Sequence, residues 1–248
     1  MAIGLWMIAS GALGGERVEV IERASVRYLV WRVDREELGR LQLHWLDQAG
    51  QPMGHFGALR DRLGERGLEI EFATNAGIYE RGPKPCGLTV CQGEEVVKLN
   101  LADGEGNFYL KPNGVFFVDE ANRAGVMEAA AFGKSGVKAR IATQSGPMLL
   151  SGGRMHPAFN VNSKNLRQRS AVGVRKADGQ VIFVVTDRSD ADKRRVSFHA
   201  LASLFLELGC EEALFLDGDI SDFAVNPGPQ TVFTPQTFAA MFALVRER

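Results

Sequence analysis

Residues 214–223 read LFLDGDISDF, and the expected fold and candidate site are built outward from this stretch. Apolar residues lead into Asp217-Gly218, and two further acids, Asp219 and Asp222, follow. A short apolar run bounded by a glycine turn predicts a buried strand. Carboxylates are costly to bury without partners. The acids are therefore expected where the strand leaves the core, either as a solvated turn or as a functional cluster.

The segments that precede this strand predict a hairpin and a helix. Residues 170–175 and 181–186 are two strand-like runs joined by Asp178-Gly179, a turn dipeptide. Residues 197–208 then form an amphipathic pattern that Ser197 can cap and Gly209 can end. The late part of the chain is thus expected to be a hairpin, a helix and a buried strand in that order.

The rest of the chain also predicts mainly strands. Alternating apolar residues predict strands at 16–23, 26–34, 41–46 and 68–72, and helical spacing predicts a helix at 53–66. Hairpins are expected at 88–101 around Gly93 and at 108–118 around Asn113-Gly114. A short helix is expected at 126–132, and a strand at 138–144 that continues through 148–150. Residues 158–169 are polar and predict no regular structure.

The last helix is expected at 234–248. Thr234-Pro235 suits a helix start, and the apolar residues Phe238, Met241, Phe242 and Val245 fall at helical spacing. We therefore predict an α/β protein of the α+β type. It would be a single domain over residues 16–248 with a mixed, largely antiparallel sheet flanked by helices.

Composition predicts a soluble globular protein. The chain has 248 residues, of which 45% are apolar and 24% charged, and its net charge is −1. Without a Lys/Arg-rich run, nucleic acid and anionic membranes are not expected partners. Residues 1–15, MAIGLWMIASGALGG, resemble a secretory leader that lacks a basic start, or they form a first strand. A periplasmic or secreted location is expected, with a cytoplasmic one as the alternative, and no stretch is long enough to span a bilayer.

Several common chemistries are excluded by spacing. Gly133-Lys134-Ser135 lacks the earlier glycine of a phosphate-binding loop, because Glu128 stands there. The dinucleotide-binding motif G-x-G-x-x-G and the serine-hydrolase motif G-x-S-x-G are both absent, and the four histidines are scattered. The acids of residues 217–222 lack the spacing of an EF-hand loop. No cofactor and no metal are expected.

Five motifs in a fixed order resemble the phosphodiester glycosidase family. They are TNAGIY at 74–79, TQSGPML at 143–149, RSAVGV at 169–174, VVTDR at 184–188 and LDGDIS at 216–221. The resemblance covers residues 73–227. It implies hydrolysis of a sugar-1-phosphodiester at the anomeric C–O bond by an exported protein, with a small-molecule or glycan phosphodiester as substrate. The family's last motif usually runs Asp-Gly-Gly-Gly-Ser, so Asp219 and Ile220 depart from it.

The chemistry of such a cleavage selects the candidate residues. Positive charge builds on the sugar, so carboxylates at the ends of late strands, Asp217 and Asp187, are the expected catalytic groups, with Asn75 beside them. Arg169 is the expected phosphate ligand because a guanidinium can hold two phosphate oxygens. Backbone and hydroxyl contacts to the substrate are expected from Ser145, Gly146, Gly77, Gly218 and Ser221.

Each candidate also has an ordinary structural explanation. The segment 75–77 can be a turn, Arg169 a surface residue, Asp187 the start of a solvated loop, and residues 145–147 a bulge. Two rival functions remain open from the sequence. The altered last motif also fits a non-catalytic protein that binds phosphoglycans or cell-wall polymers. The acid cluster also fits a cytosolic structural domain stabilised by calcium. The oligomeric state is not predicted.

Overall fold

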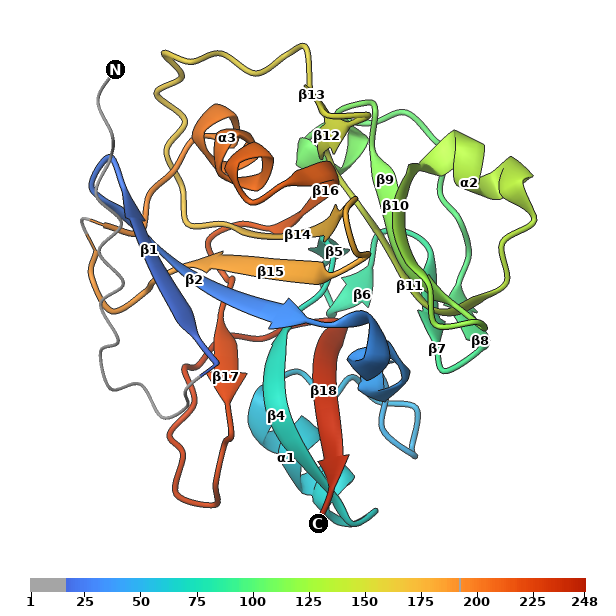
Figure 1. Cartoon of the computed structure of the whole chain (residues 1–248). Helices are drawn as coiled ribbons and strands as arrows, with labels where there is room; N and C mark the ends of the chain where they lie inside the picture. Colours follow the sequence, from blue (N-terminus) through green and yellow to red (C-terminus); the bar gives the residue numbers. More distant parts are fainter. Residues whose placement is uncertain (1–16, 192) are drawn as a thin grey trace.

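Three antiparallel sheets enclose one shared apolar core (Figure 1). The structure is a computed structural model that describes residues 17–191 and 193–248. Phe183, Phe116 and Phe242 come from different sheets, and their rings contact one another. The ring centroids lie 6.1 Å apart for Phe116 and Phe183, 5.5 Å for Phe116 and Phe242, and 5.3 Å for Phe183 and Phe242. Aromatic side chains bury a large apolar area. This contact therefore fixes how the sheets sit together.

The largest sheet has seven strands in the order β1-β2-β15-β14-β16-β12-β13. Every strand pair within the described residues is antiparallel. Its strands are β1 (Glu19–Arg23), β2 (Val26–Val33), β12 (Met148–Ser151), β13 (Arg154–Met155), β14 (Ser170–Arg175), β15 (Val181–Thr186) and β16 (Cys210–Asp217).

The other sheets have five, four and two strands. The five-stranded sheet contains β7 (Thr89–Cys91), β8 (Glu94–Val97), β9 (Gly114–Asp119), β10 (Ala124–Glu128) and β11 (Ala139–Ser145). The four-stranded sheet contains β3 (Leu41–His44), β4 (Leu68–Asn75), β17 (Phe223–Val225) and β18 (Met241–Glu247), and the short hairpin contains β5 (Tyr79–Glu80) and β6 (Lys84–Pro85).

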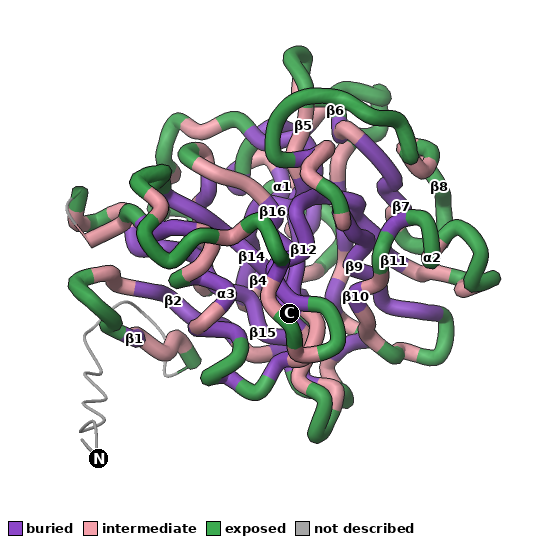
Figure 2. The backbone as a smooth tube through the Cα atoms, turned by 90° about the horizontal axis from the view of Figure 1, so that it is seen from above, coloured by how far each residue is buried: buried purple, intermediate pink, exposed green. Residues whose placement is uncertain are grey.

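One α-helix packs on the outer face of each of the three larger sheets. These are α3 (Phe198–Glu207) on the seven-stranded sheet, α1 (Phe56–Gly64) on the four-stranded sheet and α2 (Ala129–Ser135) on the five-stranded sheet. Short 3-10 helices occupy Arg35–Arg40 and Asn107–Tyr109. Strands in the middle of each sheet are therefore covered on both faces, and buried residues fill the centre of the molecule (Figure 2).

The predicted late unit and the fold class are confirmed. The β14–β15 hairpin, helix α3 with its Ser197 cap, and strand β16 follow in the expected order. Along β16, Leu214 and Leu216 face the shared core, whereas Ala213 and Phe215 face α3. The run is apolar throughout because both of its faces are buried. The predicted α+β domain is present, with several sheets in place of one.

The predicted last helix is wrong, because residues 241–247 form strand β18 between β3 and β4. Phe242 and Leu244 face the shared core, and Met241, Ala243 and Val245 face α1. A strand buried on both faces carries apolar residues at almost every position. Some of them then fall at helical spacing by coincidence.

Three smaller predictions also need correction. Asn113-Gly114 is no hairpin turn: β9 starts at Gly114 and pairs with β10 after it, and residues 107–109 are 3-10 helical. The helix predicted at 126–132 exists as α2 but begins only at Ala129, because residues 124–128 form strand β10. After β11 the chain leaves its sheet at Gly146-Pro147, so β12 pairs with β16 in another sheet. Which sheet a strand joins depends on partners that are distant in sequence, so the local pattern at 138–150 did not show that the chain moves from one sheet to another here.

The leader-like residues 1–15 lie outside the described residues. Within the described part of the chain, no helix is long and apolar enough to cross a membrane.

Gly173 lets α3 approach the seven-stranded sheet closely. A Cβ atom there would lie 2.6 Å from Phe205 Cδ1 and 2.9 Å from Cys210 Sγ. We expect Gly173→Ala to lower the free energy of unfolding by about 1–3 kcal/mol, because the buried strand leaves no room for it. Gly228→Ala is the control, since a Cβ there has no neighbour within 4 Å. Chemical denaturation measures both, and equal stabilities would contradict the packing.

Candidate active site

Polar residues at strand ends from the three larger sheets meet at one place. Asn75 ends β4, Ser145 ends β11, Ser170 begins β14 and Asp217 ends β16. Because β14 and β16 are antiparallel neighbours, Ser170 is paired with Asp217 across the ladder. The Ser145 hydroxyl donates to the Leu216 carbonyl at 2.8 Å. The tertiary structure thus brings together four positions that are far apart in sequence.

The Ser170 hydroxyl is the centre of a buried hydrogen-bond network. It accepts from Asn75 Nδ2 at 2.9 Å and from the Asp217 N–H at 3.2 Å, and its oxygen lies 2.9 Å from Ser221 Oγ. Asn75 Oδ1 in turn accepts from the Asp222 N–H at 3.2 Å. Ser170, Asn75 and Ser221 are all buried. Since buried polar groups need partners, this network fixes the backbone on both sides of Asp217.

Asp217 is the titratable group of this cluster. Burial raises the pKa of its carboxyl to about 7, the hydrogen bond from the Gly218 N–H opposes this, and the nearby Asp219 adds to it. The Asp217 charge also contributes, after burial, to the raised pKa of Tyr79 on β5. Burial, Glu80 and Asp217 together raise the pKa of Cys86 to about 11.

The three acids of residues 217–222 have different surroundings. Asp219 is exposed. Asp222 accepts from Thr234 Oγ1 and from the Phe223 N–H, and burial raises its pKa. Among residues 17–191 and 193–248, no three His, Cys, Asp or Glu side chains are placed to hold a metal ion.

Two of the predicted glycines are required by packing. A Cβ at Gly77 would lie 2.6 Å from the Gln144 carbonyl, and one at Gly146 would lie 2.7 Å from Asn113 Cβ. At Gly218, by contrast, the nearest atom would be the Gln168 carbonyl at 3.8 Å, an ordinary contact. Protein packing therefore explains why positions 77 and 146 are glycines. It does not explain why position 218 is one, because a side chain would fit there. Their contact with substrate stays a prediction.

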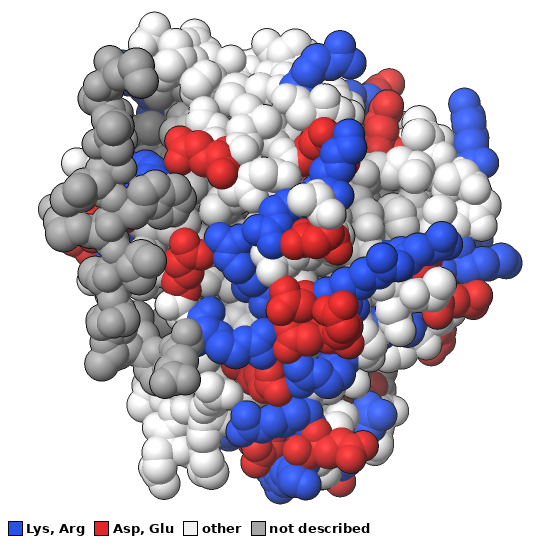
Figure 3. Space-filling view, viewed as in Figure 1, with Lys and Arg blue, Asp and Glu red and all other residues white. Residues whose placement is uncertain are grey.

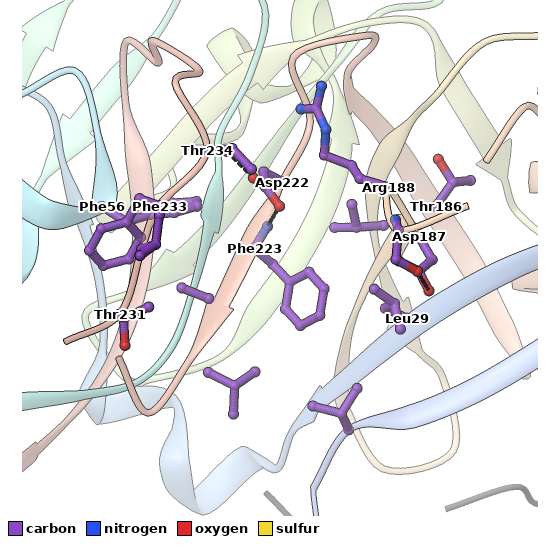
Figure 4. A pocket seen from close by; sticks show the side chains of 16 residues that line it. Leu29, Phe56, Thr186, Asp187, Arg188, Asp222, Phe223, Thr231, Phe233 and Thr234 are labelled. Atoms are coloured by element: carbon purple, nitrogen blue, oxygen red, sulfur yellow. Dashed lines mark hydrogen bonds between the residues drawn. The ribbon is translucent and has the colours of Figure 1, made fainter. Parts of the chain in front are cut away.

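Asp187 lies in a neighbouring cavity of about 320 Å³. The cavity extends from Asp187 at one end to the rings of Phe56 and Phe233 at the other (Figure 4). Asp187 is buried, accepts from the Ser189 backbone N–H and hydroxyl, and lies 3.3 Å from Arg27 Nε. Asp217 is not among the described residues that line this cavity. The two predicted carboxylates thus have separate surroundings.

Arg169 is buried next to the network but makes different contacts. Its side chain is 1% exposed, and its guanidinium carbon lies 3.7 Å from the ring centroid of Phe198. Nε donates to the Val196 carbonyl at 2.9 Å and Nη2 to the Asn165 carbonyl at 3.1 Å. Burial lowers its pKa to about 10. These contacts join two loops, and its role as a phosphate ligand stays a prediction.

Sequence reasoning missed Ser170, Gln168 and Tyr79. Ser170 stands in the RSAVGV motif directly after Arg169, so the motif marked its position but not its role. Gln168 is buried, and its Nε2 donates to the Ser221 carbonyl at 2.6 Å. Its neighbours carry polar side chains over several positions, which gave no periodic signal. Tyr79 lies on β5 of the short β5–β6 hairpin, and the Asp217 charge contributes, after burial, to its raised pKa.

Comparison with known proteins identifies the family. Residues 69–237 match the phosphodiester glycosidase family. The uncharacterized protein YigE of Escherichia coli (strain K12) is 33% identical over 190 residues, which cover 76% of this chain and 71% of YigE. The chain therefore belongs to the phosphodiester glycosidase family, as its motifs predicted.

Solved structures share the fold. The zebrafish N-acetylglucosamine-1-phosphodiester alpha-N-acetylglucosaminidase catalytic domain, auto-inhibited by its pro-peptide, matches with a TM-score of 0.62 at 15% identity. The match covers 98% of this chain and 87% of that one. A Burkholderia pseudomallei K96243 protein whose export is inferred matches with a TM-score of 0.56 at 13% identity, over 92% of this chain and 74% of that one. At such identities the likeness concerns the fold.

Replacing the central hydroxyl tests the network. We expect Ser170→Ala to lower the free energy of unfolding by about 1–3 kcal/mol, because it leaves buried donors of Asn75 and Asp217 without their acceptor. Ser203→Ala is the control, since that hydroxyl only bonds the His199 carbonyl of its own helix. Denaturation of both variants is the measurement. A Ser170→Ala protein as stable as the control would contradict the network.

Proposed function

We propose that the protein hydrolyses a sugar-1-phosphodiester at the anomeric C–O bond. The observation that carries the proposal is the Asp217 carboxyl, partly buried at the end of a central strand with its pKa raised to about 7. A carboxyl with such a pKa exchanges protons near neutral pH, as general acid–base chemistry requires. Membership of the phosphodiester glycosidase family supports the reaction class.

In the proposed reaction the ionised Asp217 acts on the sugar side. Breaking the anomeric bond builds positive charge on the ring, which a carboxylate stabilises or relieves by activating water. The departing phosphate is a good leaving group, so it needs electrostatic stabilisation more than a proton. Asn75 and Ser221 position Asp217 through the Ser170 network. Asp187 ranks second as a candidate catalytic carboxylate. Its oxygens are already engaged by Ser189 and Arg27, so they are less available to a substrate than those of Asp217.

The location is part of the proposal. We place the protein in the periplasm or outside the cell. The leader-like composition of residues 1–15 supports this placement. A structural neighbour whose export is inferred also supports it.

Asp217→Asn tests the reaction. On a panel of sugar-1-phosphodiesters, we expect release of free sugar by the native chain and a fall in kcat of about 10²–10⁴-fold in the variant. The native rate should rise with pH through about 7, because the ionised carboxylate is the active form. Glu95→Gln, an exposed charge change on β8, should leave the rate unchanged. Saturable binding with ligand recovered intact would support the non-catalytic alternative instead.

The same substitution should stabilise the protein at high pH. Folding raises the pKa of Asp217 from 3.8 to about 7. The folded protein is therefore most stable, with respect to this group, below about pH 4, and it loses that stability as pH rises towards and through 7. We expect Asp217→Asn to melt at a higher temperature than the native chain at pH 8, with little difference at pH 4. Melting curves across this range measure it. A difference that does not vary with pH would contradict the buried carboxyl.

A further inference from the structure

A small hollow beside the Asp217 loop is lined mainly by arginines. It has a volume of about 200 Å³, and we call it the arginine hollow. Its lining residues are Arg167, Gln168, Arg188, Arg194, Arg195 and Asp219. Four arginines and one aspartate give it a formal charge of +3. The family resemblance drew attention to none of these arginines as a ligand.

Among the described residues, the hollow arginines have no carboxylate partner of the kind that many other arginines have. On the face of Figure 3, basic and acidic side chains are intermingled. Elsewhere in the described chain, arginines pair with carboxylates, as Arg32 does with Glu19 (2.8 Å) and Arg40 with Glu71 (2.6 Å). Within the described residues, none of the four hollow arginines makes an ion pair with a carboxylate. Four positive charges gathered around a single acid, Asp219, repel one another. The hollow is therefore electrostatically suited to an anion.

The hollow is built onto the segment that follows Asp217. Arg188 donates to the carbonyls of Asp219, Ile220 and Ser221 at 3.2, 3.3 and 3.2 Å. Gln168, another lining residue, donates to the same Ser221 carbonyl. Arg188 also lines the cavity that contains Asp187. The backbone of the segment that follows Asp217 is thus held by two residues that line the hollow.

The amount of charge decides which anion fits. A phosphodiester carries one negative charge, whereas the hollow carries a formal +3. A phosphomonoester carries about −1.5 to −2 at pH 7 and three strong acceptor oxygens. Arginine forks match these oxygens in pairs. A ligand with phosphate charge beyond that of the cleaved diester therefore fits better than a simple diester.

We propose that the arginine hollow binds a further phosphate group on the leaving-group side of the substrate. The substrate would then be a sugar phosphodiester whose other half carries additional phosphate, as in a phosphorylated glycan or a phosphate-linked polymer. This inference rests on the proposed function for its catalytic part. Binding of phosphate in the hollow does not depend on turnover.

Two matched substrates test the catalytic part. Both carry the same sugar-1-phosphodiester, and the leaving group ends in a hydroxyl in one and in a phosphomonoester in the other. We expect kcat/KM to be at least about tenfold higher for the phosphorylated substrate, a preference of about 1.4 kcal/mol. Raising ionic strength from about 0.05 M to about 0.5 M should reduce this preference, because the hollow is open to solvent.

The variant Arg194→Gln/Arg195→Gln should remove the preference while leaving the hydroxyl substrate unaffected. Within the part of the chain that the structure describes, these two arginines make no hydrogen bond to residues 218–222, unlike Arg188. Arg66→Gln/Arg154→Gln changes the net charge equally outside the hollow and is the control. Melting temperatures check that both variants fold. A preference that persists in the first variant, or is lost equally in the control, would overturn the proposal.

Calorimetric titration with inorganic pyrophosphate tests binding alone. We expect saturable binding by the native chain and at least about tenfold weaker binding by Arg194→Gln/Arg195→Gln. If neither substrate is hydrolysed but pyrophosphate binding still depends on these arginines, the hollow stands and the proposed function fails. If both substrates are hydrolysed at equal rates and pyrophosphate binds all variants alike, the function stands and the hollow is refuted.

Discussion

The contact between Phe116, Phe183 and Phe242 is the interaction on which the rest of the structure depends. Each ring comes from a different sheet, so burial of this apolar area holds the three sheets against one core. With the sheets fixed in this way, strand ends carrying polar side chains come together at the junction. Those polar groups must then bond to one another, and the Ser170 hydroxyl is the atom at which they do so.

The Ser170 network and the Asp217 carboxyl have opposite effects on the stability of the fold. Asn75 and Ser221 are neutral side chains with satisfied hydrogen bonds, so they hold the loop rigid at little electrostatic cost. Asp217, in contrast, is held where its ionised form is disfavoured, which raises its pKa towards neutrality. Such placement lowers stability, and groups held at such a cost are frequent in active sites.

The segments next to strands β14 and β15 also position the charged residues around the loop that follows Asp217. The carbonyls of residues 219–221 accept from Arg188, and that of Ser221 also from Gln168, whereas Arg169 turns to the other side and stacks on Phe198. Adjacent residues of an extended chain point to opposite faces, so successive positions serve packing and surface in turn. The departure of Asp219 from the family motif places an acid at the edge of the arginine hollow. The altered motif and the basic loops therefore form one local electrostatic environment.

Local patterns in the sequence determined the hairpin of β14 and β15, helix α3 and strand β16, because turn residues, a cap and apolar periodicity act over neighbouring positions. They also marked Asn75, Ser145 and Asp217 as polar ends of strands. Only the tertiary structure decided that residues 241–247 form a strand, because its apolar residues face two different layers. It alone decided that Arg169 is enclosed and that Ser170 is central, since both depend on partners from distant segments.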